Sequence, residues 1–121
     1  MNTLGINGEN LATAYLLSHF YSVLMRNFRS KYGEIDIIAR KSNHIICVEV
    51  KLLTSRRHSI PALRVNRVKL HKIHMCYEAF ISQNPMYKNF PVHVDIISIV
   101  LSQRGHVELE HYKNIDMTDI S

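Results

Sequence analysis

Hydrophobic residues near the N-terminus recur with the period of an α-helix. Their stripe consists of Leu11, Ala12, Tyr15, Leu16 and His19, and it predicts a helix over residues 8–19. Asn7 is the predicted N-cap, because its side chain can accept a hydrogen bond from the first turn. Residues 21–29 are apolar and then basic, which predicts a strand, and Gly33 marks a turn or bulge after it.

Two runs rich in β-branched residues, 35–39 and 45–50, predict a pair of antiparallel strands. Ser42-Asn43 lies between them, and asparagine tolerates the left-handed conformation that a tight turn requires. The hydrophobic pattern therefore places a β-hairpin at the centre of the chain.

The second half of the chain predicts a loop over residues 53–61 and a helix over 62–83, which Asn84-Pro85 ends. The predicted buried stripe of this helix consists of Val65, Val68, Ile73, Cys76, Tyr77, Phe80 and Ile81. The strongly apolar segment 92–101 predicts a central strand, and 106–112 a last strand. The order α-β-β-β-α-β-β predicts a single α/β domain over residues 1–121, a mixed sheet flanked by helices.

Composition limits the class of protein. The chain is 46% hydrophobic, which is ordinary for a globular domain, and no apolar run approaches the roughly 18 residues of a membrane span. The N-terminus shows no signal-peptide pattern. Cys47 and Cys76 lack the spacing of a ligand pair, so we expect them in the core of a cytoplasmic protein.

Charge is concentrated in one stretch of this chain, whose net charge is +5. No acidic residue lies between Glu49 and Glu78. The basic residues of that stretch include Arg56, Arg57, Arg64, Arg67, Lys69 and Lys72, with His71 and His74 among them. Such a block favours nucleic acid as a partner, and it is also typical of a solvated helix face.

Counting outward from the hairpin turn places Lys41 opposite His44 and Ile38 opposite Cys47. Continued, the count places Asp36 opposite Glu49, with Lys51 on the same face as Glu49. The carboxylates would then lie about 5 Å apart. A slip of one residue would separate them.

Like charges facing each other in a sheet are destabilising, so this pair predicts a compensating cation. Carboxylate oxygens suit Mg²⁺ or Mn²⁺, which can activate water and hold a phosphate oxygen. Lys51 would orient that water or offset developing charge. The alternative is an ion-pair network that joins Glu34 to Lys51 and Asp36 to an arginine.

Glu9 is a possible third acid. It shares a helix face with Ala12 and Leu16, and its alternative role is a first-turn acid that interacts with the helix dipole.

Several of these segments together resemble the YraN-type family of bacterial proteins. They are Asn27-Phe28-Arg29, residues 33–39 (GEIDIIA), Val48-Glu49-Val50-Lys51, Gly5, Gly8-Glu9, Ala12, Tyr15-Leu16, Pro61, Val65, Lys69, Ile73 and Val94-Asp95-Ile96-Ile97. The resemblance covers nearly the whole chain. The chain departs from the pattern at Leu53, where relatives usually carry an arginine, and at Ser59, where they favour glycine.

That family is similar to the restriction-endonuclease-like superfamily, which includes Holliday-junction resolvases. The resemblance implies that Asp36, Glu49 and Lys51 form the acid, acid and lysine site, with Glu9 as the helix-borne acid. Asp36, Glu49 and Glu9 would then hold the metal, and Lys69 would project toward the site or contact phosphate. The resulting hypothesis is a metal-dependent nuclease that binds structured or damaged nucleic acid, DNA rather than RNA, and hydrolyses its phosphodiesters. The alternatives are a non-catalytic nucleic-acid-binding module and a basic-faced protein-interaction module.

Overall fold

The computed structural model describes residues 7–53, 66–102 and 104–115. Its elements, in chain order, are α1 (Gly8–Ser18), β1 (Ser22–Ser30), β2 (Gly33–Lys41), β3 (His44–Leu53), α3 (Arg67–Gln83), the 3₁₀ turn η3 (Pro85–Tyr87), β4 (Val92–Leu101) and β5 (Val107–Tyr112). The predicted order α-β-β-β-α-β-β is confirmed.

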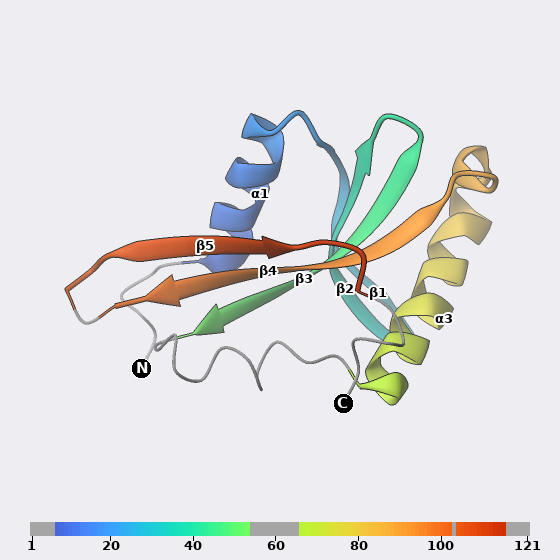
Figure 1. Cartoon of the computed structure of the whole chain (residues 1–121). Coiled ribbons are helices and arrows are strands. Elements are labelled where there is room, and N and C mark those ends of the chain that lie inside the picture. Colours follow the sequence, from blue (N-terminus) through green and yellow to red (C-terminus); the bar gives the residue numbers. More distant parts are fainter. Residues whose placement is uncertain (1–6, 54–65, 103, 116–121) are drawn as a thin grey trace.

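The five strands form one mixed sheet in the order β1-β2-β3-β4-β5. Among the described strand pairs only β3–β4 is parallel, because the chain crosses over the sheet through α3 between them. Helix α1 covers one face and α3 the other, so the domain has three layers (Figure 1). The middle strand is β3, and β4, predicted to be central, lies one position further out.

Helix α3 buries one side against the sheet. Its contribution to this core consists of Leu70, Ile73, Cys76, Tyr77 and Phe80. The prediction that Val68 is buried was wrong, since its side chain is 63% exposed. Positions separated by three and four residues share a helix face. Leu70, Ile73 and Tyr77 follow this spacing and define the buried face, and position 68 does not lie on it.

The same core contains the two cysteines. Cys47 and Cys76 are buried free thiols, which confirms their predicted place. The Cys76 thiol donates to the carbonyl of Gly33 at 3.5 Å, and it therefore ties α3 to the first residue of β2.

On the opposite face, α1 packs through Ala12 and Leu16. Asn7 caps the helix as predicted, and its Oδ1 accepts the Asn10 N–H at 3.0 Å. Within the described ranges, no helix combines the length and apolar character needed to cross a membrane.

Two local predictions need correction. Helix α3 begins at Arg67 and not at residue 62, because Asn66 is extended and caps the helix by accepting the Lys69 N–H. In the β2–β3 turn the left-handed residue is Ser42, with φ of 53°, and not Asn43.

Candidate active site

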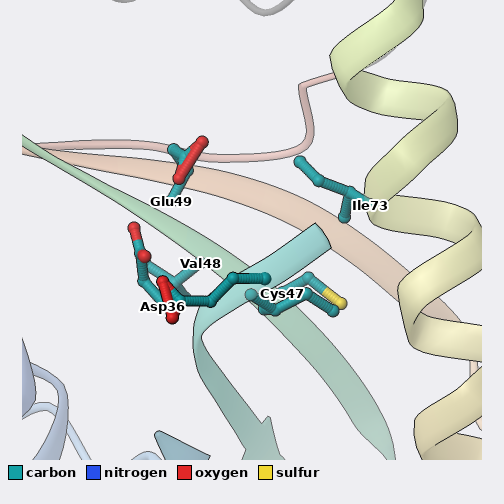
Figure 2. Close-up of a pocket in the computed structure, with 7 residues that line it drawn as sticks. Asp36, Cys47, Val48, Glu49 and Ile73 are labelled. Carbon is teal, nitrogen blue, oxygen red and sulfur yellow. The ribbon is translucent and has the colours of Figure 1, made fainter. Parts of the chain in front are cut away.

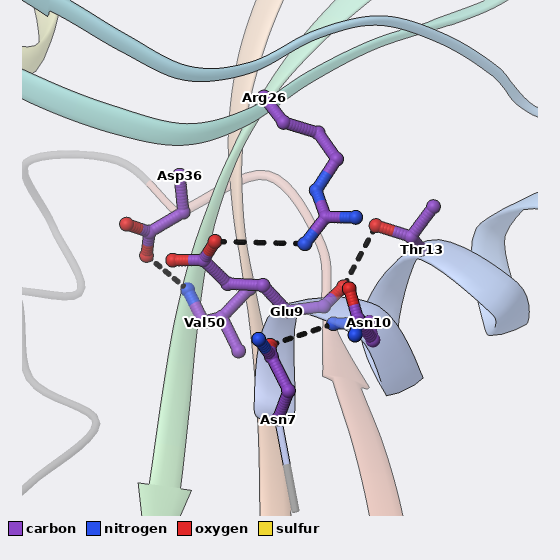
Figure 3. Close-up of polar contacts among 7 residues, drawn as sticks. All are labelled: Asn7, Glu9, Asn10, Thr13, Arg26, Asp36 and Val50. Carbon is purple, nitrogen blue, oxygen red and sulfur yellow. Dashed lines mark hydrogen bonds and ion pairs between the residues drawn. The ribbon is translucent and has the colours of Figure 1, made fainter.

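The predicted hairpin register is confirmed from Lys41↔His44 to Ile37↔Val48. The β2–β3 ladder ends there, one pair before Asp36 and Glu49 would face each other. Instead, the Val50 N–H donates to Asp36 Oδ2 at 2.8 Å, so a side chain takes the place of a backbone acceptor (Figure 3). The two strands therefore form a fork, and Asp36 lies inside it.

The β2–β3 ladder ends at Asp36, where the regular alternation of side chains between the two sheet faces is interrupted in both β1 and β2. Arg26 pairs with Ile37 and Phe28 with Ile35 across the two strands. Residues two apart normally share a sheet face, yet Ile35 belongs to the α3 core and Ile37 to the α1 core. Asn27, between the two pairs, has φ of 54°, a left-handed conformation that asparagine tolerates. This irregularity turns the Asp36 side chain toward β3.

The fork raises the pKa of the Asp36 carboxyl to about 7. Burial is the largest cause, because removal from water disfavours the charged form. The Val50 N–H opposes the shift by stabilising the carboxylate, whereas the adjacent carboxyl groups of Glu49 and Glu9 add to it. Asp36 has no ion pair with any described residue, so no cation of the described chain offsets this repulsion directly.

Glu9 reaches the fork from the first turn of α1 (Figure 3). The helix start lies close against β3, since a Cβ on Gly8 would lie 3.5 Å from the Val50 side chain. Glu9 Oε1 lies 3.7 Å from Arg26 Nη2, and the buried Arg26 Nε has no hydrogen-bond partner in the described part of the chain. The sequence patterns predict no role for Arg26, whose only signal is a charge inside an apolar strand.

Glu49 approaches the fork from β3. Its side chain is 10% exposed, and Oε2 lies 3.1 Å from Lys69 Nζ of α3. Glu49 and Asp36 line one pocket together with Ile73 of α3 (Figure 2). Lys69 therefore lies at the acidic site, the alternative position that the resemblance implied for it.

Lys51 follows Glu49 by two residues on β3, so both lie on the face that α3 covers. Across the parallel ladder it pairs with Ser98 of β4. Ser98 is fully buried, and its hydroxyl has no hydrogen-bond partner within the described ranges. The structure thus brings Asp36, Glu49 and Glu9 together and places Lys51 on the same strand and face as Glu49.

The predicted ion-pair alternative differs from the observed pairing. Glu34 binds Arg29 Nε at 2.8 Å and not Lys51. Among the predicted phosphate contacts, Arg67 and Lys72 are exposed on α3. Arg56, Arg57 and Arg64 lie outside the described residues.

The donors at the fork have the chemistry of a site for a hard divalent cation. Carboxylate oxygens are the ligands that Mg²⁺ and Mn²⁺ prefer. In the described ranges, however, no three His, Cys, Asp or Glu side chains are arranged around one point. Asp36 and Glu49 could serve as a pair, and Glu9 could join only by leaving Arg26.

The raised pKa of Asp36 predicts a pH-dependent stability. Between about pH 4 and about pH 7 the folded state holds a proton that the unfolded state has lost, so stability falls as pH rises through this range. Asp36→Asn removes the titration, and asparagine can still accept the Val50 N–H. We expect the variant to be more stable than the wild type by ~1–2 kcal/mol near pH 8, a value reduced for partial solvent screening, and to gain little near pH 4.

Thermal or urea unfolding of both proteins across this pH range, without divalent ions, measures the effect. Glu34→Gln is the matched control, because Glu34 lines the same pocket but is paired with Arg29. A constant difference between wild type and Asp36→Asn at all pH values would contradict the shift.

The sheet order, the helix on each face and the forked β2 and β3 carrying two acids and a lysine define a restriction-endonuclease-like α/β domain. Residues 8–99 match the model of the family described as uncharacterised protein family UPF0102. The chain belongs to this family, the YraN family.

Relatives with the same family name cover nearly the whole chain. A UPF0102 protein of Thermodesulfovibrio yellowstonii is 41% identical over 105 residues, which is 87% of this chain and 92% of the relative. Others are those of Geobacter metallireducens, 38% identical over 93% of this chain and 90% of the relative, and Caldicellulosiruptor bescii, 35% identical over 88% and 90%. The predicted family membership is confirmed.

Proposed function

We propose that this protein is a metal-dependent nuclease that hydrolyses phosphodiesters in structured or damaged nucleic acid, DNA rather than RNA. The observation that carries the proposal is the fork between β2 and β3, where Asp36 faces the carboxyl groups of Glu49 and Glu9. Arg26 and Lys69 partly offset Glu9 and Glu49, but no described cation pairs with Asp36, so its ionised form needs further positive charge. A divalent cation would supply that charge.

In this proposal Asp36 and Glu49 hold Mg²⁺ or Mn²⁺, and Glu9 joins them when it releases Arg26. Mg²⁺ is commonly bound by one or two carboxylates, with water and substrate phosphates completing the shell, so two protein ligands suffice. When bound, the ion would supply Lewis-acid charge to a phosphate oxygen.

The chain's own residues have separable roles. The Val50 N–H fixes the orientation of the Asp36 carboxylate. Lys51, on the same face as Glu49, would orient the attacking water or offset charge that develops in the transition state. In the structure Lys69 pairs with Glu49. In the metal-bound protein Glu49 would turn toward the ion, and Lys69 would then be free to contact a substrate phosphate.

The exposed basic residues of α3 should supply phosphate contacts. Arg67→Ala combined with Lys72→Ala should weaken nucleic-acid binding for all sequences alike and reduce the slope of log K against log salt by about two units. Arg104→Ala is the control, since Arg104 is exposed in the β4–β5 turn. Fluorescence titrations from low to moderate salt measure the slope, and equal slopes for the double variant and the control would count against this face.

A nuclease screen separates the proposal from its two alternatives. Branched, flapped, single-stranded and duplex substrates should be incubated with the full chain and Mg²⁺ or Mn²⁺. Cleavage that EDTA stops supports the enzyme. Salt-dependent binding without cleavage identifies the non-catalytic module, and absence of binding leaves the protein-interaction module.

A further inference from the structure

A second polar hollow lies at the turn end of β2 and β3, roughly 16 Å along the strand from Asp36. Its volume is about 440 Å³, within the range of small-ligand sites. Lys41, His44, His93 and Lys113 line it, together with Tyr21 and Asp95. None of these residues belongs to the carboxylate fork.

The two histidines are in direct contact. His44 Nδ1 lies 2.8 Å from His93 Nε2, and the rings are stacked with an interplanar angle of 20°. Two imidazole nitrogens at this distance share one proton, since one must donate and the other accept. The second nitrogen of each ring has no hydrogen-bond partner among the described residues, so it is available to a ligand.

Among the described residues, Asp95 is the one acid that lines the hollow, and its oxygens are already engaged. Oδ2 lies 2.7 Å from His111 Nε2, and Oδ1 accepts the Asn114 N–H at 3.0 Å. The residue is 2% exposed. The described lining of the hollow therefore offers no open carboxylate to a cation.

The two lysines that line the hollow favour a ligand of negative charge. Lys41 Nζ lies 4.6 Å from the centre of the Tyr21 ring, and Lys113 is exposed at the rim. A transition metal would find two nitrogen ligands where structural zinc sites use four, and it would be repelled by two ammonium groups. An oxyanion would instead meet two ammonium groups and imidazole N–H donors.

We propose that this hollow is a second, phosphate-binding site, in which Lys41, Lys113 and the His44–His93 pair hold one phosphate group. The phosphate could belong to a free ion or nucleotide, or to a nucleic-acid backbone. The site goes beyond the proposed nuclease function, because none of its contacts depends on the carboxylate fork.

Anion binding should be linked to proton uptake. The titratable groups that line the hollow with the histidine pair are Lys41 from β2, Lys113 after β5, Asp95 from β4 and Tyr21 before β1, with His111 behind Asp95. On the other side of His93, His74 of α3 lines a neighbouring pocket with it. An anion at the outer ring nitrogens favours a further proton on the pair, because both of these nitrogens can then donate an N–H. Affinity for the anion should therefore rise as pH falls, by up to about tenfold per pH unit for each proton taken up.

Sulfate is the sharpest probe, because its charge stays constant between about pH 6 and about pH 8, so any change in affinity reports protons on the protein. The ¹⁵N signals of the imidazole rings in the full chain should be followed at constant ionic strength. We expect saturable shifts for His44 and His93 at the lower pH, and affinity at least about tenfold weaker at the higher pH.

Substitutions of lining residues test whether sulfate binds in this hollow. His93→Gln and Lys113→Met should each weaken sulfate binding by about tenfold or more, since each removes a charge-assisted contact. His106→Gln, at the exposed β4–β5 turn, is the matched control and should bind as the wild type does. Two independent variants, checked by melting temperature, guard against a change in folding.

Further titrations distinguish a free phosphate from a nucleic-acid backbone phosphate, and an anion from Zn²⁺. Equal affinity for inorganic phosphate and a short single-stranded oligonucleotide supports a free-phosphate ligand, and much tighter binding of the oligonucleotide supports a backbone phosphate. Unsaturable sulfate shifts, equal affinities for His93→Gln and His106→Gln, or binding of Zn²⁺ without sulfate would overturn the proposal. Cleavage is not measured, so failure of the nuclease function leaves this test intact.

Discussion

Asp36→Asn should reduce metal-dependent cleavage of nucleic acid by about a hundredfold or more, and Glu49→Gln should do the same. Both substitutions nearly preserve shape. Asparagine can still accept the Val50 N–H at the position of Oδ2, so the fork should keep its geometry. Each variant nevertheless loses a charged oxygen, on which a hard cation depends.

The control for this pair is Glu34→Gln. Glu34 lines the same pocket, but its carboxylate is held by Arg29, so its loss should change cleavage by less than about threefold. Initial rates at saturating Mn²⁺, with melting temperatures for all variants, make the comparison. Full activity in folded Asp36→Asn would exclude the fork as the catalytic centre.

Lys51→Met should eliminate most cleavage while metal binding remains. The substitution removes the ammonium group that would orient the nucleophile, and we expect a loss of about a hundredfold. The acids of the fork are untouched, and a positive charge on their strand and face has gone. Mn²⁺ should therefore bind as tightly as in the wild type or more tightly.

Lys88→Met, at an exposed position after η3, controls for the loss of one positive charge. The ion-pair alternative predicts a different pattern, in which Asp36→Asn, Glu49→Gln and Lys51→Met all destabilise modestly and none changes metal affinity. Loss of Mn²⁺ binding in folded Lys51→Met would likewise contradict the role of Lys51 in orienting the nucleophile. It would show that Lys51 is needed to hold the metal-binding carboxylates in place.

Local patterns in the sequence were sufficient to predict the order of the main helices and strands and most of the hairpin register. β-Branched runs around Ser42-Asn43 determine the pairing as far as Ile37↔Val48, because each following pair is set by simple alternation. The end of the ladder at Asp36 could not be predicted this way. It coincides with the left-handed Asn27 in the neighbouring strand, at the level where both strands change face.

Contacts between segments distant in the chain could also not be predicted from the sequence. Arg26 meets Glu9 because α1 starts against Val50, a packing relationship that alternation within one strand cannot reveal. His44 and His93 are 49 residues apart and meet only because the crossover through α3 makes β3 and β4 parallel. Each of these pairs depends on tertiary packing and carries no local signature.

The most direct test of the carboxylate fork is calorimetric titration of Mn²⁺ into the full chain at about pH 6 and about pH 8. A metal that binds Asp36 must displace the proton held by a carboxyl with a pKa of about 7. We predict saturable binding at the higher pH, affinity up to about tenfold weaker per pH unit below 7, and a large loss of affinity in Asp36→Asn. Absence of Mn²⁺ or Mg²⁺ uptake at about millimolar concentration, even with nucleic acid present, would contradict the account and leave a non-catalytic binding module.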